Sequence, residues 1–466
     1  MEILLIGQGP LPVELSEKHS APGFRAWYFG RALAEAGHKV RLVSLGSNSI
    51  QAPRLIADNL TLHALPEAMI TTENYLEKML ADSMPQAVVG SGVRASYLAS
   101  LYLPSSLPLW ADLFGSPMAE AQAKAAVYCD DSVIEPFLRF ERAVLERADA
   151  FSAVSVAQQH AIEGELGHCG RLTAATYGYR FVWSLPASTD FTVLPHDRNM
   201  LRGKIVPENA FVALWSGGYN TWTDIDTLFA GLDHAMSQYP DLHFVSTGGT
   251  LPPHDVATYP RFCQLVETSA YCQRYHLLGW QPFETLHNFY LEANLGIILD
   301  KWSYEAVLGS RTRLVDWLKY GLPAIATRGA ELVTELENAG AVFTFPHGAS
   351  ERLGDLLGEL AKTPLALKVA GEQGQHFVYE HYHYQVTTAP LLEWAANPRK
   401  APDSGNSADS RLDLEKKLAE LESQLEAKNA HISTIEQWAH EMETRLKGLE
   451  ASPLRRWWSK VRSKFS

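Results

Sequence analysis

The chain has 466 residues, which favours two or three domains over one, because most domains contain roughly 100–200 residues. Hydrophobic residues make up 46% and charged residues 20%, which supplies enough apolar material for large cores and excludes a chain that is disordered throughout. Asp and Glu outnumber Lys and Arg by 53 to 40, and the net charge of −13 argues against nucleic acid as a partner, since phosphate binding needs a basic face. The four cysteines form no CxxC pair, as expected for free thiols in a reducing compartment.

Residues 1–195 have the pattern of an α/β domain. An apolar run at residues 2–7 predicts a first strand, and a segment with helical spacing follows and stops at Gly37. Further strands are predicted at residues 38–46, 86–92, 107–115 and 150–155. Alternation of strands with helices is typical of a parallel sheet with helices on its faces.

Residues 196–398 repeat this pattern. Strands predicted at residues 211–218 and 242–249 end in paired glycines. Three more strands are predicted at residues 275–280, 295–300 and 322–327, each followed by helical sequence. We therefore expect an α/β protein of two Rossmann-like domains facing a cleft.

The remaining sequence predicts a linker and a coiled coil. Residues 399–410 are polar and contain Pro and Gly, as a flexible linker does. Over residues 411–450, seam positions recur at alternating spacings of three and four, which predicts a coiled-coil helix. These positions are Arg411, Leu414, Leu418, Leu421, Leu425, Lys428, Ile432, Ile435, Ala439, Met442, Leu446 and Leu449. We expect self-association or pairing with another enzyme of the same pathway; the alternative is an amphipathic helix that lies on the globular body.

The tail, residues 453–466, contains five basic residues and no acid. Leu454, Trp458, Val461 and Phe465 fall on one helical face, which suits a helix lying at an anionic membrane surface. A solvated basic tail or a docking helix for a partner is the alternative. Because the N-terminus lacks a signal-peptide pattern and no apolar stretch is long enough to span a bilayer, we expect a cytoplasmic protein, peripheral on the inner membrane.

Two glycine-ended strands carry candidate binding loops. Gly7 and Gly9 lack the third glycine of a dinucleotide-binding fingerprint, which makes a dinucleotide site a weak interpretation. Gly217 and Gly218 precede a predicted helix whose N-terminus suits a phosphate, although an ordinary strand-to-helix loop has the same pattern. In the helix that follows, Asp224 and Asp226 match a metal-binding DxD motif, which we reject because the helix begins there.

Residues 301–329 contain the strongest candidates. The guanidinium groups of Arg311 and Arg313 are suited to clamping a diphosphate. Asp316 can accept hydrogen bonds from a ribose diol, and Glu305 in the preceding loop can orient sugar hydroxyls. The alternative is a surface helix with an ion pair between Arg313 and Asp316.

Here the chain resembles the GT-B glycosyltransferases, close to the large retaining family four. "VDWLKYGLPAIAT" is similar to the family's "EAMACGLPVIAT" element, and "GSRTRLVDWLKYGLP" resembles a subgroup with "FRTRLLDYLWAGLP". Asp316 stands at the second glutamate of the family's Glu-x7-Glu pattern, and Leu308 stands at the first, so we expect Glu305 to substitute. The family's Arg and Lys after the first C-domain strand are absent, and Arg311 and Arg313 are candidates to replace them. The resemblance covers residues 1–395.

The resemblance implies a nucleotide-sugar donor held by the second domain, an acceptor that enters from the first, retention of configuration, and no metal or other cofactor. Trp280 lies near the expected base site, and Asp112 ends a first-domain strand where it can bind or deprotonate the acceptor or cap a helix. We expect transfer to a lipid-linked glycan in bacterial surface polysaccharide synthesis of the O-antigen or lipopolysaccharide type. A nucleotide-sugar epimerase or a non-catalytic scaffold of a glycan-synthesis complex is the alternative.

Overall fold

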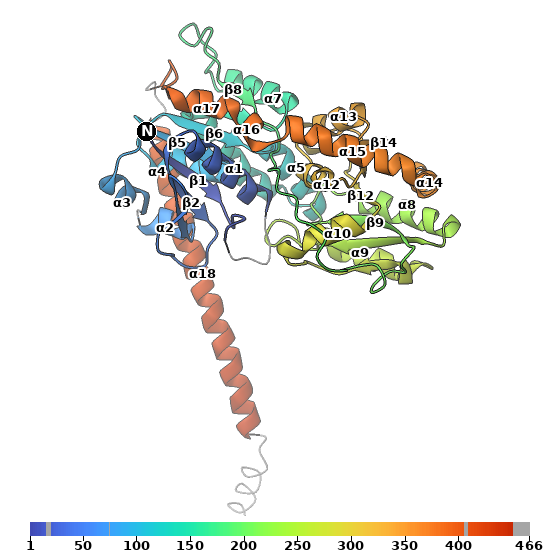
Figure 1. Ribbon diagram of the computed structural model, residues 1–466. Coiled ribbons are helices and arrows are strands. Elements are labelled where there is room, and N and C mark those ends of the chain that lie inside the picture. The colour runs from blue at the N-terminus through green and yellow to red at the C-terminus, as the bar shows by residue number, and fades with distance from the viewer. Residues whose placement is uncertain (15–19, 74, 405–408, 451–466) are drawn as a thin grey trace, which may run out of the picture.

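The computed structural model describes residues 1–14, 20–73, 75–404 and 409–450, which form two α/β units and a projecting C-terminal helix (Figure 1). The predicted α/β architecture with two Rossmann-like domains and a C-terminal helix is confirmed. The predicted tail at 453–466 lies outside the described residues. Among the described helices, none is both long enough and apolar enough to cross a bilayer.

The N-terminal unit is built on an eight-stranded sheet of order β3-β4-β2-β1-β5-β6-β7-β8. All neighbouring strands are parallel except β3, which pairs antiparallel with β4. The strands are β1 (Glu2–Gln8), β2 (Lys39–Leu45), β3 (Arg54–Ala57), β4 (Leu60–Leu65), β5 (Ala87–Ser91), β6 (Leu109–Leu113), β7 (Ala150–Ala153) and β8 (Val182–Ser184). The helices are α1 (Ala21–Glu35), α2 (Ala68–Glu73), α3 (Tyr75–Asp82), α4 (Val93–Tyr102), α5 (Pro117–Tyr128), α6 (Ile134–Arg147) and α7 (Val156–His168).

The C-terminal unit has a six-stranded parallel sheet of order β11-β10-β9-β12-β13-β14. The strands are β9 (Phe211–Ser216), β10 (Leu242–Thr247), β11 (Tyr275–Leu277), β12 (Leu295–Ile298), β13 (Ala324–Thr327) and β14 (Val342–Phe345). The helices are α8 (Ile225–Gln238), α9 (Thr258–Glu267), α10 (Leu286–Glu292), α11 (Tyr304–Leu308), α12 (Thr312–Lys319), α13 (Glu331–Asn338), α14 (Ser350–Ala361) and α15 (Pro364–His381).

After α15 the chain returns to the N-terminal unit. Two further helices, α16 (Tyr384–Thr387) and α17 (Ala389–Ala396), lie beside α1 (Figure 1). Trp394 packs on Trp110 of β6, with ring centroids 5.5 Å apart, and Tyr384 stacks on Tyr28 of α1 at 5.4 Å. The last helices of the segment 196–398 therefore belong to the core of the first unit.

Residues 399–404, expected to form part of a flexible linker, are held against the N-terminal unit. Asp403 accepts two hydrogen bonds from Arg171, at 2.8 and 2.9 Å, and Lys400 pairs with buried Asp149 at 2.9 Å. Ala401 is buried and its amide also donates to Asp149. The sequence of this segment did not predict these contacts, because the partners, Arg171 and Asp149, lie more than 200 residues earlier in the chain.

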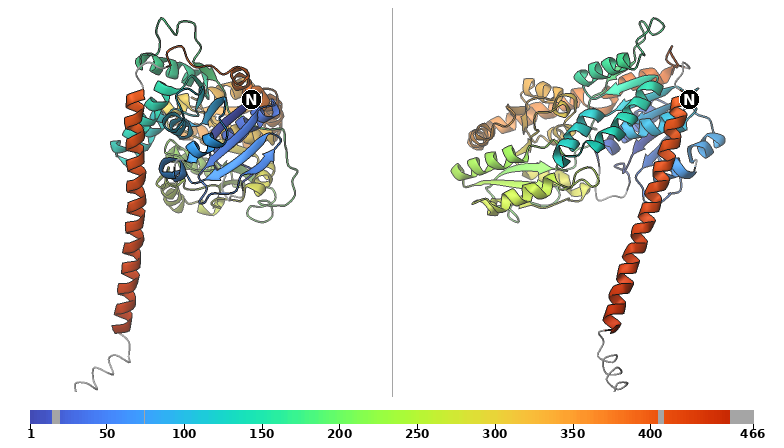
Figure 2. Two further views of the ribbon diagram at one scale, coloured as in Figure 1. Left: turned by 90° about the vertical axis from the view of Figure 1, so that its left-hand side faces the viewer. Right: turned by 180° about the vertical axis from the view of Figure 1, so that it is seen from behind.

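The C-terminal helix α18 (Asp409–Glu450) begins against the N-terminal unit and then projects away from it, as both views in Figure 2 show. Ala419 is buried in the core cluster of that unit, and Tyr97 donates a hydrogen bond to Glu415 at 2.9 Å. From residue 424 to residue 445 every residue is exposed. The helix therefore lies on the body over its first turns and stands free beyond them.

Candidate active site

The loop after β9 is the centre of the site and requires glycine. Gly217 has a φ of 86°, in the left-handed region that favours glycine. A Cβ atom on Gly248, at the end of β10, would overlap the Gly217 carbonyl oxygen, so the two strand-end loops pack backbone against backbone. Because carboxyl ends of parallel strands meet at one edge of a sheet, this edge is where ligands bind in open α/β folds.

Arg313 of α12 lies beside this loop with an unsatisfied charge. Its Nη2 donates to the carbonyl oxygen of Gly218, and its guanidinium lies over the Trp215 ring, 4.8 Å from the centroid. Its Nη1 is buried and has no hydrogen-bond partner among the described residues. Burial lowers the pKa of Arg313 to about 10, against the opposing effect of the Asp300 charge. A buried cation with a free N–H at a glycine loop is suited to an anion.

Arg311 has a different environment from the one the sequence suggested. Its Nε donates to Asp300 at 2.5 Å, and Nη1 and Nη2 donate to the two oxygens of Glu305 at 3.0 and 2.8 Å. All three side chains are buried. Although burial acts to lower it, the Asp300 and Glu305 charges raise the pKa of Arg311 above its ordinary value. The Arg311 fork is thus occupied by its own carboxylates and fixes the orientation of Glu305.

Asp316 lies one turn after Arg313 on α12. Its carboxylate has no hydrogen-bond or ion-pair partner in the part of the chain that the structure describes. Burial and then the Asp190 charge raise the pKa of Asp316 to about 6, while Lys319 acts in the opposite direction. This open carboxylate at the C-terminal unit fits the predicted role of binding a diol. The ion pair with Arg313, the alternative from the sequence, is not present among the described contacts.

The structure adds Glu120, a residue that the sequence did not single out. Glu120 lies in the first turn of α5, which contacts α11, the helix that carries Glu305. Burial and the nearby Glu305 charge raise the pKa of Glu120 to about 8, and the Arg311 charge opposes them. The Glu120 side chain has no hydrogen-bond partner among the described residues. Carboxyl groups of the two units therefore face each other across the interface.

The two units are closed on each other around these residues. Ser155 at the start of α7 donates to the Leu308 carbonyl oxygen at 3.0 Å, and the amide of Val156 donates to Glu331 at 2.9 Å. On the α12 side, Lys319 pairs with Asp190 at 2.6 Å. The first two contacts lie on the side of Glu305, and the third lies on the side of Asp316.

Two further residues singled out in the sequence, Asp112 and Trp280, lie in different parts of the structure. Asp112 is fully buried, and both carboxylate oxygens accept hydrogen bonds from Arg25, at 3.1 and 2.8 Å, with a third from Ser152 at 2.7 Å. Asp112 therefore links α1, β6 and β7 through hydrogen bonds. The residue that caps the following helix, α5, is Ser116 and not Asp112. Trp280 lies beside Gly249 at the end of β10 and donates from Nε1 to the Thr250 carbonyl oxygen at 3.0 Å.

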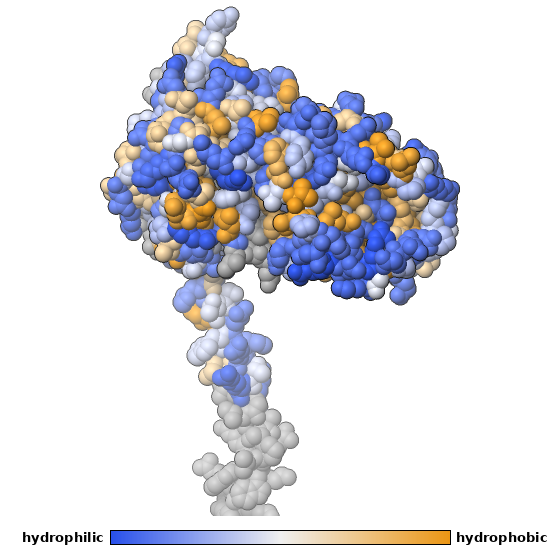
Figure 3. Space-filling model, viewed as in Figure 1, coloured by the Kyte–Doolittle hydropathy of each residue, from blue (hydrophilic) through white to orange (hydrophobic). Residues whose placement is uncertain are grey.

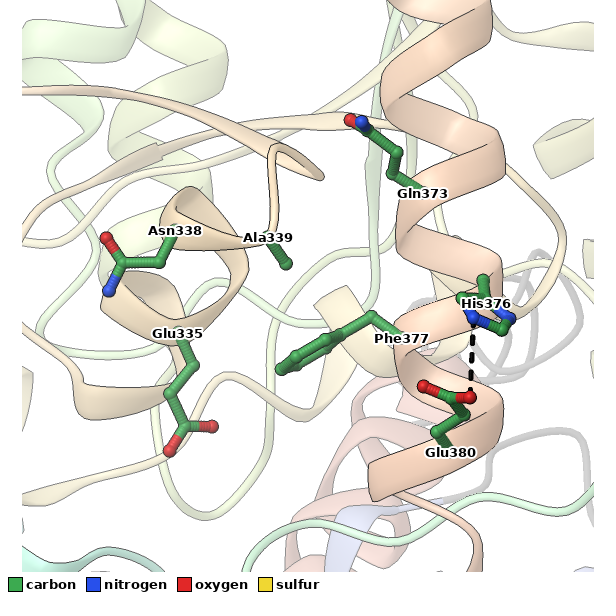
Figure 4. Close-up of a pocket in the computed structure, with 7 residues that line it drawn as sticks. All are labelled: Glu335, Asn338, Ala339, Gln373, His376, Phe377 and Glu380. Atoms are coloured by element: carbon green, nitrogen blue, oxygen red, sulfur yellow. Dashed lines mark ion pairs between the residues drawn. The ribbon is translucent and has the colours of Figure 1, made fainter.

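A shallow groove on the C-terminal unit lies apart from these residues. Figure 4 shows it between α13 and α15, with Phe377 pointing into it and His376 paired with Glu380 at 3.3 Å. None of the sequence-predicted site residues lines it. In the part of the chain that the structure describes, no three His, Cys, Asp or Glu side chains are grouped as metal ligands.

No protein-family model matches the sequence, and no curated protein matches it. Solved structures do match the fold. Sucrose-phosphate synthase from Thermosynechococcus elongatus is 15% identical with a TM-score of 0.66, over 85% of this chain and 98% of that one. Trehalose-phosphate synthase (UDP-forming) from Burkholderia vietnamiensis is 13% identical with a TM-score of 0.62, over 87% and 98%.

A third match is HepE from Anabaena, solved with UDP and glucose. It is 12% identical with a TM-score of 0.61, over 85% of this chain and 99% of the other. All three matches extend over nearly the whole of the known structures and leave about one seventh of this chain unmatched. The two Rossmann-like units, the site at their interface and these matches show that the chain has the GT-B fold.

Proposed function

We propose that the chain transfers a sugar from a nucleoside-diphosphate-sugar donor to a hydroxyl group of a glycan acceptor. The observation that carries this proposal is the buried Arg313, whose free Nη1 lies beside the Gly217–Gly218 loop. The fold matches support it, because one of those proteins is a UDP-forming synthase and another was solved with UDP. The resemblance around residues 310–323 points to the same chemistry.

The assigned roles follow from the environment of each side chain. Departure of the nucleoside diphosphate builds negative charge on its β-phosphate, and Arg313 with the amides near Gly217 would stabilise that charge most in the transition state. Glu305, oriented by Arg311, would bind the donor sugar. Asp316 would bind the ribose. Retention of configuration and independence from metal remain proposals drawn from the resemblance.

The direct experiment is a thermal-shift screen with UDP, GDP, ADP, CMP and dTDP, followed by calorimetry with the best ligand. A nucleoside diphosphate that raises the melting temperature at millimolar concentration supports the proposal. No shift with any of the five contradicts it and favours the alternative of a non-catalytic scaffold. The observation that favours this alternative is the projecting helix α18, because a scaffold needs a surface for binding other proteins.

Donor affinity is expected to fall as the pH drops below about 6. The carboxyl group of Asp316 has a raised pKa of about 6, and its ionised form accepts the hydrogen bonds of a ribose diol more strongly than its protonated form does. Below that pKa, affinity should fall by up to about tenfold per pH unit. Calorimetry with an intact nucleotide sugar, whose diphosphate carries no proton in this range, measures the effect.

The Asp316→Asn variant is the control for this pH dependence. It should bind the donor more weakly at pH 8 and lose the decrease between pH 7 and pH 5. A variant with the same pH profile as the natural chain would remove Asp316 from the site.

Glu120 is proposed to bind a substrate hydroxyl from the N-terminal side. Its pKa of about 8 keeps the side chain protonated at neutral pH, so it can both donate and accept a hydrogen bond. Above pH 8 its ionisation places a second negative charge opposite Glu305. We therefore expect kcat/KM to decrease above about pH 8.

The Glu120→Gln variant should keep transfer activity at pH 7 and lose the decrease above pH 8, because the amide cannot ionise. Glu120→Ala should lose about tenfold at pH 7, as expected for one missing hydrogen bond. Steady-state transfer measured from pH 6 to pH 9 tests both. An unchanged alkaline decrease in the Gln variant would assign it to another group.

The acceptor is proposed to be a lipid-linked glycan at the cytoplasmic face of the inner membrane, in surface polysaccharide synthesis of the lipopolysaccharide type. The support is in the sequence, where residues 454–466 combine basic and aromatic residues suited to anionic lipid. Co-sedimentation with anionic liposomes, with and without residues 451–466, tests it. Equal sedimentation of the two chains contradicts membrane attachment through the tail.

Association through α18, with a second copy or with a pathway enzyme, completes the proposal. Its support is the exposed apolar residues of the helix, which include Leu425, Ile432 and Ile435.

A further inference from the structure

One face of α18 packs against the N-terminal unit of its own chain. Arg139 of α6 pairs with Glu422 at 2.9 Å, and Thr71 of α2 makes a hydrogen bond with Ser423 at 2.9 Å. Lys416 lies over the Tyr102 ring of α4, 5.1 Å from the centroid, and Ala419 is buried at the centre of the contact. These residues define the docked face of the helix.

The heptad seam lies on the opposite face. Successive side chains of an α-helix are rotated by about 100° around its axis. Measured from Ala419 in one direction around the axis, Leu418 lies at about 100° and Leu421 at about 160°. Both seam residues therefore point away from the side on which Ala419 is buried. The exposed fractions agree, because Leu421 is 55% and Leu425 59% exposed while Ala419 is 9% exposed. The body of the chain therefore leaves the seam uncovered from residue 414 to residue 442.

An uncovered seam on a free helix requires a partner. Residues 424–450 extend about 40 Å at 1.5 Å per residue, and in proteins most of the stability of a helix comes from packing of its apolar face. Figure 3 shows the upper part of this helix standing clear of the body. Ile432 and Ile435 are each about half exposed. A partner helix that covers the seam would stabilise the projecting segment.

The edges of the seam indicate which partner and which direction. One edge is acidic or polar and the other is basic, polar or aromatic. The first edge holds Glu415, Glu422, Asn429, Glu436 and Glu443, and the second holds Lys417, Gln424, His431, Trp438 and Arg445. In a parallel coiled coil the second edge of one helix meets the first edge of the other, five residues further on. His431 would then face Glu436 of the second copy, and Lys417 would lie next to Glu422, which also pairs with Arg139 of its own chain.

An antiparallel pair brings like edges together. The first edge would then place glutamates against glutamates, which is destabilising. The same glutamates disfavour an anionic membrane as the cover of this seam. Lys428, the one charged seam position between Leu414 and Met442, favours two strands, because its aliphatic stem can pack in a narrow seam while its ammonium group reaches water.

We propose that α18 pairs with α18 of a second copy of this chain as a parallel two-stranded coiled coil through Leu418, Leu421, Leu425, Ile432 and Ile435, with each body docked on the outer face of its own helix. This inference deepens the proposed association through α18 and does not depend on sugar transfer.

Light scattering after size-exclusion chromatography of the full-length chain tests the association. We expect twice the chain mass of 51.7 kDa at micromolar concentration. The variant Ile432→Asp/Ile435→Asp should give the mass of one chain. The matched control Ala430→Asp/Ser433→Asp adds the same charges about 180° away from the seam and should stay at twice the mass. A single-chain mass for the natural protein, a three-chain mass, or dissociation of the control would overturn the proposal.

The direction of pairing is tested by Ala439→Cys under mild oxidation. In a parallel pair the two introduced thiols meet across the seam within the distance of a disulfide. In an antiparallel pair centred near residue 428 they lie roughly 30 Å apart. A cross-linked dimer absent from the oxidised natural chain is expected, and a dimer without this cross-link would overturn the parallel arrangement. Nucleotide binding is measured separately, so failure of this inference leaves the proposed sugar transfer untouched.

Discussion

Replacing Arg313 with alanine is expected to lower kcat/KM for sugar transfer by about 100- to 1,000-fold, the usual effect of removing one donor to a developing charge. The reason is the free Nη1 of Arg313, which is buried at the strand-end loop and has no protein partner among the described residues. Steady-state kinetics with the donor found in the nucleotide screen measure this effect.

Stability separates this role from a structural one. Because the charge of Arg313 is buried without a counter-ion contact, its removal should leave the melting temperature of the ligand-free protein unchanged or higher. Arg328→Ala is the matched control, since Arg328 is exposed and pairs with Glu337. If Arg313→Ala transferred sugar as fast as this control, the anion site would lie elsewhere.

Replacing Arg311 with alanine is expected to lower the stability of the protein as its main effect. It leaves Asp300 and Glu305 buried without their shared counter-ion, a change that typically costs about 3–5 kcal/mol. For a unit of about 200 residues this corresponds to a melting temperature lower by about 10 °C. Thermal denaturation followed by circular dichroism measures it.

A second variant distinguishes positioning from direct phosphate binding by Arg311. The combination Arg311→Met, Glu305→Gln and Asp300→Asn removes all three charges together, and most of the lost stability should return. The restored protein should bind free nucleoside diphosphate with an affinity close to that of the natural chain, and lose transfer. Loss of nucleotide affinity in the restored protein would assign Arg311 to the diphosphate after all.

The sequence predicted the strands whose apolar runs are buried on both faces. The strands β1, β5, β9 and β12 were expected because such runs end in glycine or aspartate. Four strands were missed, namely β3, β4, β8 and β14. They are short or partly exposed, and their sequences, such as that of β14 (Val342–Phe345), lack a continuous apolar run.

The candidate site was predicted in part. The sequence singled out the Gly217–Gly218 loop at a predicted strand end, and Arg313 and Asp316 in the helical segment before a Gly-Leu-Pro turn. It could not assign the partners of Arg311, since Asp300 lies eleven residues earlier and reaches the guanidinium only through the packing of β12 against α12. The position of Asp300 at the end of a buried strand was the available signal.

Glu120 and the docked face of α18 depend on contacts between distant segments. Glu120 lies in a helix of ordinary composition, and its importance arises from α11 on the other unit. On α18, Glu415 and Glu422 recur at a spacing of seven at one edge of the seam, which indicates a contact surface beside it. Their basic partner, Arg139, could not be identified without the tertiary structure.

The docking of α18 has a mechanical consequence. The contacts of α18 described above all go to α2, α4 and α6, which belong to the N-terminal unit. If the far end of the helix is tethered, the N-terminal unit is fixed to the tether, and any movement between the two units displaces the C-terminal unit. The tether then need not flex when the two units move, and the N-terminal unit keeps a constant distance from whatever the helix is fastened to.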